Sequence, residues 1–147
     1  MPLVNDRMTK EDAEKIATPA PRGEYEVEIT KVFADESGNV EFVSEKGNSM
    51  LKIGMKIVSG PFTNGMNTDE KGLNIGKLVK TYYAIFGTGF MAAFKRAFPS
   101  CLNEEGVINT DLCVGLRARA YLKISTHEGN DSNEIGKLLA YKPSDAE

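Results

Sequence analysis

The sequence predicts a mainly β protein of one domain, with a helical insert in its second half. Residues 23–33 and 112–125 alternate apolar with polar side chains, which is the period of a half-buried strand. Between them, residues 74–98 repeat apolar side chains at the spacing of a helix. A chain of 147 residues can bury one core of this kind but is too short for two.

The first 22 residues are expected to form an arm that precedes the domain. The prolines of Thr18–Pro21 cannot continue a helix and favour extended backbone before them. The first strand is predicted over Gly23–Phe33, with one face in the core and an acidic outer face that would repel DNA. The acidic side chains of that face are Glu24, Glu26 and Glu28.

The second strand is predicted over Met50–Val58, where apolar residues alternate with Lys52 and Lys56 on the outward face. A short extra hairpin is expected around residues 40–43, because clusters of turn residues lie on both sides of them. Residues 62–73 are rich in Asn, Thr, Asp and Gly, and we expect the third strand among them.

The helical insert is predicted to begin at Asn74, a residue type that caps helix N-termini. Gly87–Gly89 interrupts the apolar repeat, and Pro99 ends its second part. We therefore expect a kinked helix or a helical hairpin, with Lys77 and Lys80 on its outward side. Its aromatic residues are expected in the core: Tyr82, Tyr83, Phe86, Phe90, Phe94 and Phe98.

The fourth strand, Leu112–Ser125, shows the clearest alternation in the chain. Exposed antiparallel faces are polar but need not be uniformly cationic, so a row of cations there indicates contact with a polyanion. The last strand is predicted over Asn133–Tyr141, before a short acidic tail at 144–147. The outward residues of the fourth strand are Arg117, Arg119, Tyr121 and Lys123.

Three strands, a helix and two further strands are the connectivity of the OB-fold, a five-stranded Greek-key barrel with the helix between strands three and four. The domain would span residues 23–143. Such barrels bind single strands by stacking bases on aromatic rings and placing phosphates beside Lys and Arg. Lys52 and Lys56 would extend the groove that the fourth strand begins.

Charge is distributed unevenly along the chain, although the net charge is only −3. Residues 1–45 carry five basic and eleven acidic side chains, residues 46–127 eleven and five, and residues 128–147 two and five. The stretch from Lys71 to Leu102 holds no carboxylate. Local potential rather than net charge steers a polyanion to a surface, so the basic middle of the chain is compatible with nucleic-acid binding.

Residue types argue against membrane, metal and catalytic functions. No apolar run approaches the ~20 residues of a spanning helix, and the N-terminus lacks a signal-peptide pattern, so a cytoplasmic protein is expected. Cys101, Cys113 and His127 are too few for a disulfide framework or a zinc site. Gly76–Leu78 lacks the residues of a phosphate-binding loop. We expect no enzyme, no cofactor and no metal.

Six short motifs occur in a set order along residues 20–143. They are Gly23-Glu24-Tyr25, Met50-Leu51-Lys52, Gly60-Pro61-Phe62, Gly115-Leu116-Arg117-Ala118-Arg119, Asn133-Glu134-Ile135 and Tyr141-Lys142-Pro143. In this order the chain resembles a family of bacteriophage-encoded single-stranded DNA-binding proteins, which implies an OB-fold. It departs from the family at Asn67–Glu70, where relatives more often have an aromatic strand segment, and its acidic tail lacks a terminal Phe.

The function predicted from these observations is sequence-tolerant binding of single-stranded DNA in phage replication or recombination. Phosphates would meet the lysines and arginines, and a base would stack on Tyr121. Replication or recombination proteins are expected as further partners, a homo-oligomer remains open, and no membrane is involved. The alternative is an OB-fold protein-interaction module, an adaptor or inhibitor of a host protein that uses its acidic ends. The predicted contacts are Arg117, Arg119, Tyr121, Lys123, Lys52 and Lys56, with Phe62, Lys77 and Lys80 as accessory residues.

Overall fold

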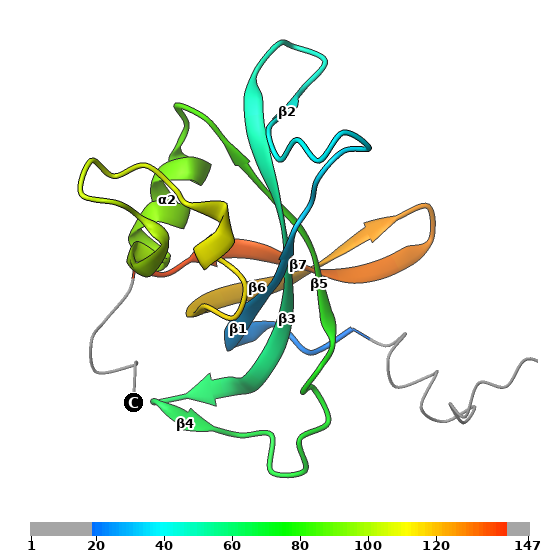
Figure 1. The fold of residues 1–147 in the computed structure, drawn as a ribbon. Coiled ribbons are helices and arrows are strands. Elements are labelled where there is room, and N and C mark those ends of the chain that lie inside the picture. The colour runs from blue at the N-terminus through cyan, green and yellow to red at the C-terminus, as the bar shows by residue number, and fades with distance from the viewer. Residues whose placement is uncertain (1–18, 141–147) are drawn as a thin grey trace, which may run out of the picture.

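The computed structural model describes residues 19–140, which form a barrel with one helix packed beside it (Figure 1). The predicted arm up to Thr18, the end of the last predicted strand at Tyr141 and the acidic tail at 144–147 lie outside the described residues. Within residues 19–140, no helix has both the length and the apolar character needed to cross a membrane.

Five long strands close into the barrel. They are β1 (Gly23–Val32), β3 (Ser49–Thr63), β5 (Leu78–Ile85), β6 (Arg117–His127) and β7 (Asn130–Leu138). They pair in the circular order β1, β3, β5, β7, β6 and back to β1. Every pairing in this circle is antiparallel except that of β5 with β7. The predicted mainly β class and the barrel are thus confirmed.

Two short strands extend the ends of β3 as hairpins (Figure 1). β2 (Phe42–Val43) matches the hairpin expected around residues 40–43. A third strand was expected within residues 62–73, but only the two-residue β4 (Met66–Asn67) begins there. Asn64 and Gly65 both have positive φ, which produces a tight two-residue turn between β3 and β4. The third barrel strand is therefore β5, further along the chain.

The expected helix from Asn74 to Phe86 is wrong, because this segment contains β5. Val79 and Tyr82 are both buried three residues apart, as they would be on a helix. The cause is a register shift in the pairing of β5 with β3, which interrupts the two-residue alternation there. The run of Val, Thr, Tyr and Ile residues from 79 to 85 favours a strand once neighbouring strands can pair with it.

The second part of the predicted insert is helical. α2 (Gly89–Ala97) follows β5 and precedes β6 in the chain. The Thr88 hydroxyl accepts a hydrogen bond from the Phe90 backbone N–H and caps the helix. Pro99 follows the helix and opens η1 (Pro99–Cys101). α2 packs against β5 and β7, with Met91, Phe94 and Ala97 buried.

β3 is longer than the predicted second strand. The turn-like Ser59-Gly60-Pro61 does not end it, because β3 continues to Thr63 with register shifts against β1. Gly60 has a φ of 121°, and a Cβ at this position would lie 2.8 Å from the Tyr25 ring. Glycine therefore lets β3 bend closely over a ring that belongs to the core.

β6 begins at Arg117, five residues later than the predicted start at Leu112. Leu112 ends the short helix η2 (Thr110–Leu112), and Val114 is exposed. The backbone then turns at Gly115, which has a φ of 93° and donates a hydrogen bond to the Ile29 carbonyl. β7 also begins three residues earlier than predicted, because Glu128 and Gly129 form a tight hairpin turn with positive φ.

The core lies inside the barrel and beneath α2. Its largest fully buried side chains come from β1, β3, α2 and the segment that follows α2, and include Tyr25, Ile53, Phe94 and Phe98. Of the aromatic residues expected in the core, Tyr82, Phe94 and Phe98 are buried, whereas Tyr83, Phe86 and Phe90 are exposed. The expected burial of these three is wrong, and three aromatic rings are available to solvent.

Candidate nucleic-acid interface

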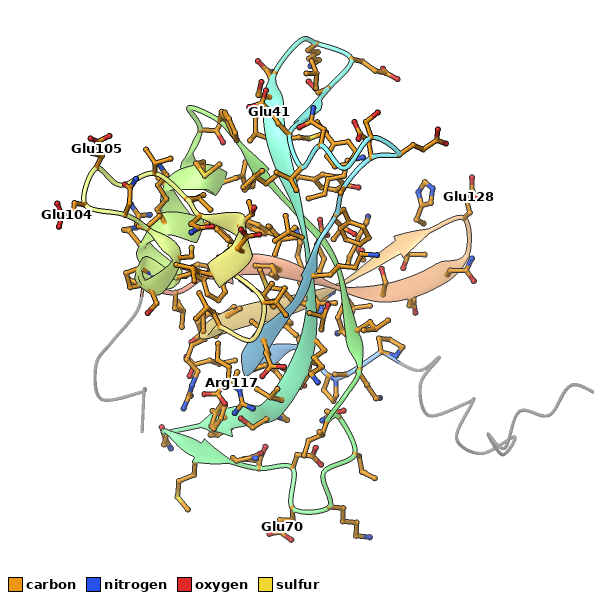
Figure 2. All side chains as sticks on the ribbon, viewed as in Figure 1. Glu41, Glu70, Glu104, Glu105, Arg117 and Glu128 are labelled. Atoms are coloured by element: carbon orange, nitrogen blue, oxygen red, sulfur yellow. The ribbon has the colours of Figure 1, made fainter. Side chains whose placement is uncertain are left out.

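β6 presents its polar side chains on the outer surface of the barrel. Arg117 is the first residue of β6, and Glu128 lies in the turn that follows the strand. Figure 2 shows the two at opposite ends of β6. Ala120 and Leu122 are buried between outward neighbours. The Arg117 side chain is 56% exposed, and that of Arg119 only 23%. The outward side chains are Arg117, Arg119, Tyr121 and Lys123.

The glutamates of β1 lie beside the cations of β6. Glu28 pairs in register with Arg117, and the Arg117 Nε donates to its carboxylate at 2.9 Å. Arg117 also lies 3.7 Å from Glu26, and the Arg119 Nη1 lies 3.1 Å from the Glu24 carboxylate. Each arginine of the predicted site therefore has a carboxylate partner on the neighbouring strand β1.

Lys56 belongs to the same charged row on the other side of β1. Its Nζ lies 3.5 Å from Glu28, which pairs in register with Lys56 on β3 and with Arg117 on β6. The hydrogen bond from Arg117, followed by the charge of Lys56, lowers the pKa of Glu28 against an opposing effect of desolvation. The carboxylate consequently remains ionised at neutral pH. Over β6, β1 and β3, three carboxylates balance three cations.

Arg119 is the least accessible cation of the row. Its guanidinium lies 3.7 Å from the centroid of the Phe62 ring, a cation–π contact. Its Nε is buried without a hydrogen-bond partner among residues 19–140. One face of Phe62, a predicted accessory residue, is thus covered by Arg119. A base could stack there only if the arginine moved.

The far end of β6 is more open. Tyr121 is exposed and pairs in register with Lys137 of β7, a cation that the sequence analysis did not assign to the site. The Lys123 Nζ lies 3.8 Å from the carboxylate of Glu134, at the limit of an ion pair. An exposed ring on the same strand face as Lys123 is a suitable stacking position for a base.

A second group of cations lies on the outer face of β3 and β5. Lys52 of β3 pairs in register with Tyr83 of β5, and its Nζ lies 4.3 Å from the centroid of the Phe42 ring. Lys80 is exposed on β5, and Tyr83 is 44% exposed. Neither Lys52 nor Lys80 forms an ion pair with a carboxylate in the part of the chain that the structure describes.

The two groups of cations do not form one continuous trough. β1, with its three outward glutamates, lies between β6 and β3 in the barrel. The structure brings Lys56 beside Arg117 through Glu28, but it leaves Lys52 outside this row. Lys77, expected on an exposed helix face, is buried in the segment that precedes β5. Lys80 is exposed, although on a strand.

The expected burial of Tyr83 and Phe86 follows from the helical interpretation of the segment before Gly87, whereas Phe90 lies on α2 as expected but on its exposed side. The β-branched and aromatic residues of 79–85 are the signal that favours a strand instead. In a strand, the neighbouring residues Tyr82 and Tyr83 point to opposite faces, and one of the two is exposed. The sequence thus contained the information for a surface tyrosine.

No group of three or more His, Cys, Asp or Glu side chains within residues 19–140 is placed to hold a metal ion. Cys101 and Cys113 are both free and buried. Burial raises the pKa of both thiols, that of Cys113 to about 12. The two thiols are therefore neutral at physiological pH.

Neither a scan against protein-family models nor a search of curated proteins finds a match for this chain.

Proposed function

We propose that the chain is an OB-type barrel protein that binds single-stranded DNA without catalysing a reaction, acting in phage replication or recombination in the host cytoplasm. The order of elements supports this fold: three barrel strands, then α2, then two more strands. The circular pairing order and the parallel pairing of β5 with β7 are also compatible with a Greek-key barrel of this type.

The observation that carries the proposal is the outer face of β3 and β5. Lys52 and Lys80 are cations that no carboxylate of residues 19–140 pairs with, and Tyr83 is an exposed ring on β5 that pairs in register with Lys52. Single-strand binding needs both kinds of group on one surface, cations for phosphates and aromatic rings for bases. In OB-type barrels the second and third strands form the oligonucleotide face, and here these are β3 and β5.

The cations of β6 are expected to contribute less to phosphate binding, because its two arginines already have carboxylate partners. A phosphate that approaches Arg117 must compete with Glu26 and Glu28 for the guanidinium. Exposed ion pairs are worth only about 0–1 kcal/mol, so a polyanion can displace them, but the gain per contact is reduced. We therefore assign the main phosphate contacts to Lys52 and Lys80, and weaker ones to Arg117, Arg119, Lys123 and Lys56. Tyr121 provides a second ring for stacking.

The test is fluorescence anisotropy with a labelled oligothymidylate, measured over a series of salt concentrations. We expect Lys52→Ala/Lys80→Ala to weaken binding roughly tenfold at low salt, or about 1.4 kcal/mol. The slope of log K against log salt should shrink by about 1.4, because each lost phosphate contact on a single strand removes ~0.7. The matched control is Lys46→Ala/Lys71→Ala, which removes two exposed cations elsewhere. If wild-type protein gives no binding at low salt, the proposed function is wrong.

One observation favours the alternative, a protein-interaction module. The face formed by β6, β1 and β3 carries balanced charge in alternating rows, and such a pattern is complementary to a protein surface of mixed charge. An adaptor of this kind would give no anisotropy change with DNA or RNA at low salt. The same titration with an oligouridylate of equal length distinguishes DNA preference from general single-strand binding.

A further inference from the structure

A groove runs along the outside of β5 towards α2, beyond the strand face described above. Two hollows of about 260 and 270 Å³ share the lining residues Tyr82, Phe90 and Ile135, so they adjoin each other and together make a groove. Its walls come from β5, β7 and α2, with Met50 of β3 at the first hollow. We call it the β5–β7 groove.

The groove begins at the proposed interface. Lys80 and Tyr83, which face solvent on β5, also line its first hollow. A single strand stacked on Tyr83 would therefore enter the groove without leaving the surface. The one carboxylate that lines it, Glu134, is directed towards Lys123 at 3.8 Å.

The second hollow is cationic. Arg96 of α2 and Lys137 of β7 both line it, and neither forms an ion pair with a carboxylate among residues 19–140. The rest of its lining is apolar or small, including Ala93 and Gly136. Two cations beside an apolar floor are complementary to a phosphate attached to a planar base.

Phe90 stands between the two hollows with 58% of its surface exposed. Its ring meets the ring of Tyr82 edge-on, with centroids 6.4 Å apart and an interplanar angle of 73°. The Tyr82 hydroxyl donates to the Phe90 carbonyl at 2.6 Å, which holds the start of α2 against β5. The edge-on contact limits the rotation of the Phe90 ring, so the ring loses little conformational entropy when a base stacks on it.

We propose that the β5–β7 groove is a second subsite for the single strand, in which a base stacks on Phe90 and the adjoining phosphate contacts Arg96 and Lys137. This subsite rests on the proposed function, since it extends the strand path that starts at Tyr83. It makes the binding site longer than the β3–β5 face and directs the strand towards α2.

The experiment measures affinity against oligothymidylate length for wild type and for Arg96→Ala/Lys137→Ala. With wild type, affinity should rise with length until the oligonucleotide spans both the β3–β5 face and the groove. The double variant should bind the shortest oligonucleotides as wild type does and lose roughly tenfold on the longer ones, with a salt slope smaller by about 1.4. Lys46→Ala/Lys71→Ala is the charge-matched control and should follow wild type.

Stacking is tested separately with Phe90→Leu, which keeps apolar volume but removes the ring. We expect a loss of roughly fivefold or more on long oligonucleotides, as for other base-stacking rings. Phe86→Leu is the matched control, because Phe86 is also exposed but lines a different hollow. The arginine–lysine variant changes only exposed side chains, so it keeps the test valid if Phe90→Leu proves unstable.

The outcomes separate the two proposals. If wild type binds DNA and Arg96→Ala/Lys137→Ala has the same length dependence and salt slope, the subsite is wrong and the proposed function stands. If wild type binds no oligonucleotide, both are wrong. If the variant instead loses affinity for an acidic peptide while DNA binding is unchanged, the groove is a protein site and the subsite proposal is overturned.

Discussion

At the scale of single residues, the candidate interface is defined by which cations have carboxylate partners. Arg117 and Lys56 share Glu28, whereas Lys52 rests on the Phe42 ring. This difference arises from the neighbouring strands. Glu28 of β1 lies opposite both Arg117 and Lys56, whereas Tyr83 of β5 lies opposite Lys52. Pairing across strands, which a sequence read in order does not display, decides which cations are available to a phosphate.

Glu28 gives a prediction for stability. Its pKa in the folded protein lies below the ordinary value of 4.5, so its ion pairs stabilise the fold above that pH and are lost as pH falls through the folded-state pKa. We expect Glu28→Gln to lower the free energy of unfolding by less than about 1 kcal/mol at pH 7, as is usual for exposed ion pairs.

Urea denaturation of wild type and Glu28→Gln at pH 7 and at several values below 4.5 checks this prediction. The difference between the two proteins should close as the pH falls. A difference that stays constant down to the acid limit would show that the lost stability comes from packing and not from charge. Glu41→Gln, on an exposed loop before β2, is a suitable control and should show little change at any pH.

At the scale of elements, the weakest junction of the barrel is the parallel pair β5 and β7, where only Val79 and Asn133 are in register. Ala20, three residues before β1, contacts β7 at this junction. The buried Asn133 amide accepts from the Ala20 N–H at 2.9 Å and donates to the Ala20 carbonyl at 2.9 Å. One side chain thus satisfies both backbone groups of a buried residue 113 positions away.

Asn133→Ala should therefore destabilise the protein by roughly 2–6 kcal/mol, because two buried backbone groups lose their partners at about 1–3 kcal/mol each. Thermal and urea unfolding measure the change. Ser132→Ala is the control, since the Ser132 hydroxyl has only a 3.4 Å contact with Ser125 and its loss should be small. Equal stability of the two variants would mean that water replaces the amide at this junction.

At the scale of the whole molecule, the barrel and the segment after α2 enclose the two cysteines. Cys101 lies in η1, and Cys113 follows η2 directly; both side chains are fully buried. The Cys101 thiol donates to the Phe98 carbonyl at 3.1 Å. The two thiols are reached only when this part of the fold opens.

We expect neither thiol to react with a disulfide reagent such as Ellman's reagent in the native protein at pH 7–8, and both to react in urea. Thiolate is the reactive form, and burial raises the pKa of Cys113 to about 12. Absorbance of the released thiolate gives the rate. Rapid reaction of one equivalent without denaturant would contradict the enclosed position of these residues.

The sequence alone determined the strands whose alternation is regular, and with them the barrel class. In β1 the buried residues Tyr25, Val27 and Ile29 alternate with polar ones, and in β6 Ala120 and Leu122 do so, a pattern visible without knowledge of the neighbouring strands. It also identified the outward side chains of β6, because the face of a strand follows directly from its period of two. The helical residues before Pro99 could also be predicted, because their apolar spacing and the proline that follows them are local signals, whereas the cap at Thr88 was not expected.

Only the tertiary structure decided the character of residues 74–86 and the partners of the cations. In β5 a register shift against β3 imitates helical spacing, so the local pattern misleads until the neighbouring strand is present. Arg117 is neutralised by the glutamates of β1 because closure of the barrel places β1 and β6 side by side. Glu28 and Arg117 are 89 residues apart in the sequence. Periodicity fixes the direction in which a side chain points, but only folding determines which side chain it meets.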